Sequence, residues 1–175
     1  MSSQTETPTA RTHWLHVIAF GRKPRNTLIR AAILVVVVGI VFGFRILLPI
    51  RVEGISMLPT FNDNSFHLIN RLAYWHHSPQ RGDIVSIRYA GIHYMLLKRV
   101  VGLPGETVAF ADGRVLIDGQ PLDEPYEKEK CDWNMPAEKL SANEYFVVGD
   151  NRTMPMNLHL FGRTTRERIV GKLLL

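Results

Sequence analysis

The sequence contains a single cysteine among its 175 residues, which excludes an intramolecular disulfide. That residue, Cys131, lies in a polar stretch and is expected to be an ordinary free thiol. Cysteine, histidine and acidic residues do not recur at the spacing of a zinc site, and no glycine-rich phosphate loop precedes a helix pattern. The sequence therefore predicts neither a metal ion nor another cofactor.

An excess of positive charge is confined to one end of the chain. The formal net charge is +5, a balance that could indicate a nucleic-acid-binding protein. Residues 1–51 contain seven basic residues and one acidic residue, whereas residues 52–175 contain 14 basic and 15 acidic residues. The larger part of the chain is thus slightly negative, which argues against a nucleic-acid partner.

One long apolar run lies within this basic region. Residues 31–44 carry no charge, and the side chains of Arg30 and Arg45 at its ends are long enough to reach the headgroups of a bilayer. On length alone, the run also fits a buried helix or the apolar part of a signal peptide. Taken over residues 28–49, it spans a hydrocarbon layer of ~30 Å at ~1.5 Å per residue. We predict one transmembrane signal-anchor helix there, with the lipid bilayer as a partner.

The flanking charges predict how this helix is oriented. More basic residues precede it (Arg22, Lys23, Arg25 and Arg30) than follow it (Arg45 and Arg51). By the positive-inside rule, residues 1–27 form a cytoplasmic tail and residues 50–175 an extracytoplasmic domain of a single-pass protein in the inner or plasma membrane. No small-residue cleavage site directly follows the apolar run, so the anchor is expected to be retained.

From residue 50 onward the pattern is that of an antiparallel β domain. Apolar and polar residues alternate over 83–89, and Asp112-Gly113 separates two short apolar runs as the turn of a hairpin does. No long helix is predicted after the anchor, and the Glu- and Lys-rich stretch 123–141 is expected to be an exposed excursion. The strands are expected over 83–89, 95–101, 107–110, 115–118 and 145–148.

Two residues in this domain suggest nucleophilic catalysis. Ser56 lies just beyond the apolar run, and Lys98 lies among Leu96, Leu97, Val100 and Val101. A serine hydroxyl needs a base to remove its proton, and a lysine amine can do so only when it is neutral. Apolar burial favours the neutral amine. Taken alone, Ser56 could be an ordinary turn serine and Lys98 a surface residue on an edge strand.

Four sequence blocks in the same order resemble the type I signal peptidases. They are 54–60 (GISMLPT), 81–85 (RGDIV), 98–105 (KRVVGLPG) and 148–152 (VGDNR). The resemblance runs from about residue 50 to the C-terminus, and the N-terminal anchor fits the same layout. It implies a mainly β fold, an antiparallel sheet or partly open barrel. It also implies a membrane-bound serine endopeptidase that cleaves signal peptides from secreted preproteins after small residues.

The same resemblance assigns roles to residues of this chain. Ser56 is the nucleophile, Lys98 the general base, and the Ser56 backbone N–H an oxyanion donor, while Gly54 stands where some members have a second donor. Preprotein signal peptides are the expected partners, with the secretion translocon as a candidate. The shallow substrate pockets are expected at Ile50, Val52, Met57, Phe61, Ile87 and Leu97, although Ile87 fits core packing almost equally well. Structural support is expected from Arg99, Asp150, Asn151 and Arg152.

The last block departs from the family pattern. The family usually has a serine, an aspartate and an arginine where this chain has Pro155, Asn157 and His159. Pro155 cannot supply the hydroxyl that helps to orient the family's lysine, and Asn157 removes a negative charge. His159 could replace the arginine's hydrogen bonds, but it is expected to be exposed and unpaired. These changes leave two alternatives open: a specialised or catalytically weakened member such as a dedicated maturase, and a non-catalytic membrane-tethered domain that binds peptides.

Overall fold

The computed structural model describes residues 24–90, 94–127 and 131–174. The chain divides into two units, Met1–Phe44 and Arg45–Leu175, each of which is described by itself. The described part of the first unit, residues 24–44, belongs to the helix α2, Pro24–Ile46, which is long and apolar enough over Asn26–Ile46 to cross a membrane. Most of the predicted tail, residues 1–23, lies outside the described residues.

The helix ends earlier than the sequence predicts. It stops at Ile46, and Leu47–Arg51 form the strand β1 instead of the last turn of an anchor that reaches residue 49. Leu48 and Ile50 of β1 pack against the buried core of the second unit, and every residue of β1 is paired with β2, Phe66–Asn70. Apolar composition alone does not separate a membrane helix from an adjoining core strand, which explains the difference.

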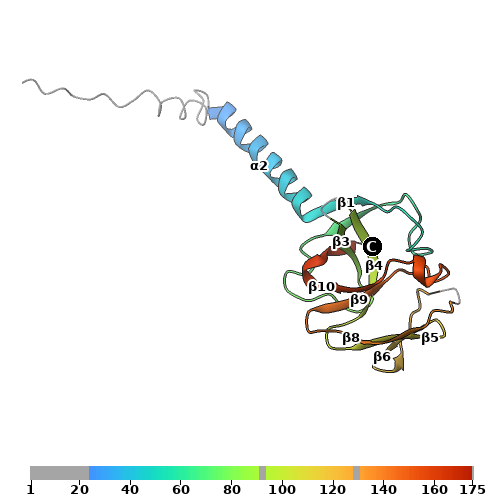
Figure 1. Ribbon diagram of the computed structural model, residues 1–175. Coiled ribbons are helices and arrows are strands. Elements are labelled where there is room, and N and C mark those ends of the chain that lie inside the picture. The colour runs from blue at the N-terminus through green and yellow to red at the C-terminus, as the bar shows by residue number, and fades with distance from the viewer. Residues whose placement is uncertain (1–23, 91–93, 128–130, 175) are drawn as a thin grey trace, which may run out of the picture. The chain divides into compact units, whose positions relative to one another are not determined.

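The second unit contains two antiparallel sheets, drawn as separate layers in Figure 1. In the seven-stranded sheet the order is β1-β2-β11-β3-β4-β9-β10, and β1 and β10 form its edges. The predicted strands at 83–89, 95–101 and 145–148 are confirmed as β3, β4 and β9. The bounds of the remaining elements of this sheet and its connections are β3 Ile84–Ala90, β4 Tyr94–Gly102, β9 Glu144–Val148, η1 Met156–Leu158, β10 Gly162–Thr165, η2 Arg166–Arg168 and β11 Ile169–Leu174.

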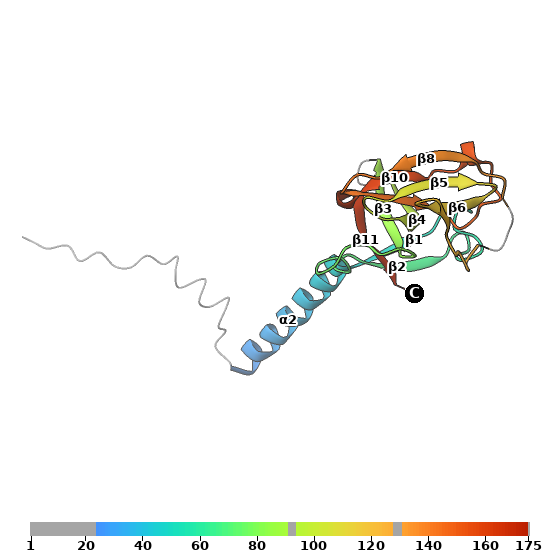
Figure 2. The same cartoon turned by 90° about the horizontal axis from the view of Figure 1, so that it is seen from below.

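The smaller sheet has the order β7-β6-β5-β8 and is seen from another side in Figure 2. Its strands are β5 Thr107–Ala111, β6 Arg114–Ile117, β7 Gln120–Pro121 and β8 Met135–Lys139. The predicted hairpin at Asp112-Gly113 is confirmed, since β5 pairs with β6 on either side of it. Both turn residues have positive φ, 48° and 79°, which Asp and Gly tolerate and which the tightest hairpin turns require.

The expectation for residues 123–141 was wrong. This stretch contains β8, which pairs with β5, and it buries Trp133 and Leu140 to 2% exposure each. Both side chains belong to a core cluster with Val101, Val108 and Phe146, which joins the two sheets. Trp133 and Leu140 each follow a charged residue in a stretch rich in Glu and Lys, so the composition does not reveal that this segment joins the two sheets.

Candidate active site

Ser56 lies in the turn that follows β1, and the segment 149–151 holds this turn in place. The backbone N–H of Asn151 donates to the carbonyl oxygen of Ser56 at 3.0 Å, and the side-chain amide of Asn151 donates to the carbonyl of Ile55 at 3.0 Å. Ser56 itself is half-buried. Within the described residues, the backbone N–H of Ser56 donates to no other group, so it is free to donate a hydrogen bond to an oxyanion.

Lys98 lies on β4, inside the larger sheet between β3 and β9. Its side chain is 2% exposed. Burial lowers the pKa of the Lys98 amine to about 8, while the carboxylate of Asp150 acts in the opposite direction. A lysine in water has a pKa near 10.4, so burial raises the neutral fraction by a large factor at pH 7 to 8.

Asp150 connects the serine turn to the lysine strand. Its carboxylate accepts from Arg99 Nε at 2.9 Å and from Arg99 Nη2 at 2.5 Å, and it also accepts the hydroxyl of Thr60 at 2.5 Å. Arg99 follows Lys98 on β4, whereas Thr60 belongs to the segment that begins with Ser56. One buried carboxylate therefore ties the backbone of the candidate base to that of the candidate nucleophile.

A second buried ion pair, between Arg152 and Glu124, supports the segment 149–151 that holds this turn. Arg152 donates from Nε to the carbonyl of Gly149 at 2.8 Å, and its Nη2 pairs with Glu124 at 2.6 Å. Glu124 also accepts from the hydroxyl of Tyr126 at 2.7 Å, and the ring of Tyr126 lies 3.8 Å from the guanidinium of Arg99. The four residues expected to give structural support, Arg99, Asp150, Asn151 and Arg152, thus all contact this region.

His159 does not have the exposed, unpaired position expected from the sequence. It is 5% exposed, and its Nε2 lies 3.4 Å from Lys98 Nζ and 3.1 Å from the backbone nitrogen of Gly149. The ring also packs edge-on against Trp133, with 4.9 Å between ring centroids. The expectation was wrong because the position of this side chain depends on Gly149 and Trp133, which are distant from it in the sequence.

Gly149 is the point at which these groups meet. A Cβ at this position would overlap the carbonyl oxygen of Ser56 and would lie 2.6 Å from His159 Nε2. Only glycine allows the backbone of the serine turn and the imidazole beside Lys98 to approach so closely. Within the described residues no hydrogen bond joins the Ser56 hydroxyl to the Lys98 amine, a contact that in unliganded enzymes is often completed when substrate binds.

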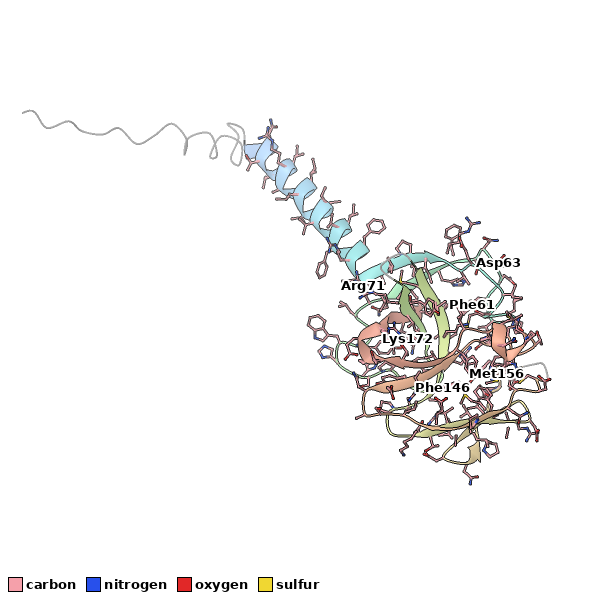
Figure 3. The ribbon with its side chains drawn as sticks, viewed as in Figure 1. Phe61, Asp63, Arg71, Phe146, Met156 and Lys172 are labelled. Atoms are coloured by element: carbon pink, nitrogen blue, oxygen red, sulfur yellow. The ribbon has the colours of Figure 1, made fainter. Side chains whose placement is uncertain are left out.

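Ser56 opens into a cavity of about 480 Å³. Four of the six predicted pocket residues line it, namely Ile50, Val52, Met57 and Leu97. Phe61, labelled in Figure 3, packs in the core with Met57 and Ile69 and is not among the lining residues. Ile87 lines a separate cavity of about 140 Å³, which Lys98 also borders. Among the described residues, no group of three His, Cys, Asp or Glu side chains is arranged to hold a metal ion.

Sequence reasoning missed three contributors to this site. Thr60 and Glu124 reach it only through hydrogen bonds to distant residues, 90 and 28 positions away, and a single sequence does not reveal such pairs. His159 stood in a block already singled out as unusual. Its replacement of the family's arginine was the available signal, but the sequence does not show which side chains surround it.

Comparison with known proteins supports the same assignment. Residues 25–175 match the family model described as signal peptidase, peptidase S26. Signal peptidase I of Leptolyngbya laminosa is 38% identical over 125 residues, which cover 67% of this chain and 62% of that protein. The probable signal peptidase I-1 of Synechocystis sp. is 32% identical over 77% of this chain and 73% of its own length. Signal peptidase I V of Bacillus subtilis is 32% identical over 81% of this chain and 92% of its own length. With a family model that covers most of its length and several relatives above 30% identity, this chain belongs to the signal peptidase I family, peptidase S26.

Proposed function

We propose that this chain is an active, membrane-anchored serine endopeptidase in which Ser56 is the nucleophile and Lys98 the general base. The observation that carries the proposal is the buried amine of Lys98, whose pKa is lowered to about 8. This amine lies 3.4 Å from His159 Nε2, which also accepts the backbone N–H of Gly149 in the segment that holds the Ser56 turn. The substrates of signal peptidases are the signal peptides of preproteins, and the cavity beside Ser56 provides a place for the residues before the cleaved bond.

The reaction follows from the chemistry of the two side chains. Neutral Lys98 accepts the proton of Ser56 as Oγ forms a bond to the scissile carbonyl carbon. The Ser56 backbone N–H stabilises the oxyanion, and Lys98 then returns the proton to the departing amine as the C–N bond breaks. In the second half, Lys98 takes a proton from water as the water oxygen bonds to the carbonyl carbon of the acyl-serine ester. Lys98 then returns that proton to Ser56 Oγ as the ester bond breaks, which releases the signal peptide with a free carboxylate and restores both side chains.

The extended substrate is proposed to bind along β1. This strand is an edge of the larger sheet, and among the described residues it pairs only with β2, so its outer backbone groups are available to a peptide in extended conformation. Ile50, Val52, Met57 and Leu97 contribute apolar walls to the cavity at this edge. We propose that these apolar walls receive small substrate residues at the positions that point into the cavity, whose lining also includes the polar side chains of Arg51, Glu53 and Ser86.

The membrane arrangement is proposed from the charges at the two ends of the anchor. One apolar helix near the N-terminus is long enough to cross a membrane. More basic residues precede it than follow it, which supports a cytoplasmic tail at 1–27 and an extracytoplasmic catalytic domain that begins near residue 50. This orientation would place Ser56 where preproteins leave the translocon, which we propose as a neighbour of the enzyme.

The proposal is tested by cleavage of a preprotein with an Ala-X-Ala site by the full-length protein in detergent. Ser56→Ala and Lys98→Ala are both expected to abolish cleavage while leaving the melting temperature within a few degrees of wild type. The matched controls Ser141→Ala and Lys139→Ala change exposed residues far from the site and are expected to cleave normally.

A non-catalytic peptide-binding domain predicts a different result. Folded wild-type protein would then bind signal peptides without cleaving any of several preproteins, and Ser56→Ala would bind equally well. A dedicated maturase would cleave one preprotein class and leave the others intact. Full cleavage by either dyad variant would refute the assigned roles.

A further inference from the structure

The structure assigns His159 a role as the positioning residue of the general base: its neutral imidazole holds the amine of Lys98 through Nε2. This inference rests on the proposed function of Lys98 and adds a third side chain to the Ser-Lys pair. It is carried by the contact between Lys98 Nζ and His159 Nε2 at 3.4 Å, made where both side chains are buried.

The tautomer of the imidazole is determined by the backbone. The N–H of Gly149 points at Nε2 of His159 from 3.1 Å, so Nε2 must carry a lone pair and the ring proton must be on Nδ1. Nδ1 itself has no hydrogen-bond partner among the described residues. An Nε2–H tautomer would lose the hydrogen bond from the Gly149 N–H. It would also point an N–H donor at the amine of Lys98.

This tautomer suits a lysine that acts as a base. A neutral amine has two N–H donors and one lone pair, and one of its N–H groups shares the single lone pair of Nε2 with the N–H of Gly149. The lone pair of Lys98 is then free for the proton of Ser56. A carboxylate in the place of His159 would also accept an N–H bond, but its charge would stabilise the ammonium and keep the base protonated.

The surroundings keep the imidazole neutral. Burial, together with the cations of Lys98 and Arg152, lowers the pKa of His159 to about 3. The charged groups that face the Lys98–His159 pair are Arg152 and Asp150 from the segment after β9, and Asp150 is already paired with Arg99. His159 therefore gives no second positive charge beside Lys98 at any pH at which the protein would work.

Local structure explains how His159 reaches Lys98 in a chain that has Pro155 where the family usually has a serine. Pro155, with φ of −52°, immediately precedes the short helix η1, Met156–Leu158, and the N–H of His159 closes that turn on the carbonyl of Met156 at 3.2 Å. This turn directs the side chain of His159 inward, where Trp133 packs against the imidazole ring. Trp133 is itself fixed by a hydrogen bond from its Nε1 to the carbonyl of Met154 at 2.9 Å.

The first readout is catalytic. His159→Phe keeps a planar ring of similar size but removes Nε2, and it is expected to lower kcat about 10²-fold, the effect of a reactive group displaced by about 1 Å. The acid limb of the pH profile of kcat should also move to lower pH. Loss of the acceptor Nε2 disfavours the ammonium form of Lys98 and so lowers its pKa. His159→Gln, whose amide oxygen can replace Nε2, should recover most of kcat and return the limb toward wild type. His76→Phe, a change of an exposed histidine, is the matched control.

The second readout does not require turnover. Long-range ¹H–¹⁵N NMR of the full-length protein should show the Nδ1-protonated neutral tautomer of His159 from pH 5 to 9, with an Nε2 shift that changes in Lys98→Met. If wild type shows this signature but cleaves no preprotein, the proposed function fails while the Lys98–His159 contact stands. An unchanged pH limb in a folded His159→Phe enzyme, or equal losses in the Phe and Gln variants, would overturn the positioning role.

Discussion

Asp150→Asn is the substitution that most directly tests how the two halves of the site are held together. The Asp150 side chain is fully buried and Arg99 is 10% exposed, and two hydrogen bonds of 2.9 and 2.5 Å join them. An amide at this position removes the charge and keeps only one acceptor oxygen, so the guanidinium of Arg99 loses its ion pair and retains the carbonyl of Gly82 and the ring of Tyr126 as its other contacts. Breaking a buried pair in this way typically costs ~3–5 kcal/mol. That is a large part of the ~5–15 kcal/mol by which domains are stable.

The cost is measured by urea unfolding of the full-length protein in detergent, followed by the near-ultraviolet signal of the β domain. With a slope of about 1.5 kcal/mol per molar urea, the midpoint should fall by about 2–3 M. The control is Arg163→Met, which removes the ion pairs that the 51% exposed Arg163 forms with Glu138 and Glu144. Such a pair contributes ~0–1 kcal/mol. Equal midpoints for the two variants would refute the reasoning that burial gives Asp150 its importance.

Three further predictions concern the base. The value of kcat/KM should increase with pH through the pKa of Lys98, about 8, because only the neutral amine accepts a proton, and it should fall roughly tenfold per unit below about pH 7. In Asp150→Asn the same limb should shift to lower pH, since the carboxylate that favours the ammonium is gone; a profile flat from pH 6 to 9 would contradict a lysine base. Pro155→Ser, which restores the family's hydroxyl at an exposed position, should change kcat by no more than about twofold, because His159 already contacts the amine. A large gain in single-turnover rate would show instead that Lys98 lacks a partner.

Much of the β domain could be predicted from local pattern. Alternation over 83–89 and the Asp-Gly turn at 112–113 identified β3 and the β5–β6 hairpin, since a strand with one buried face and a turn with positive φ have strict local requirements. Residues 47–51 and 135–139 could not be assigned in this way. In both cases the strand exists because a distant strand pairs with it, β2 for the first and β5 for the second.

The sequence by itself determined the chemistry available to this protein: an apolar segment long enough for a bilayer, a serine just beyond it and a lysine within a valine-rich strand. These depend on composition and short-range order, which a chain carries before it folds. Only the tertiary structure decided what surrounds the lysine, and it replaced an expected exposed histidine by a buried imidazole 3.4 Å from its amine. It did so because the position of His159 depends on Gly149 and Trp133, residues 10 and 26 positions away that folding alone brings together.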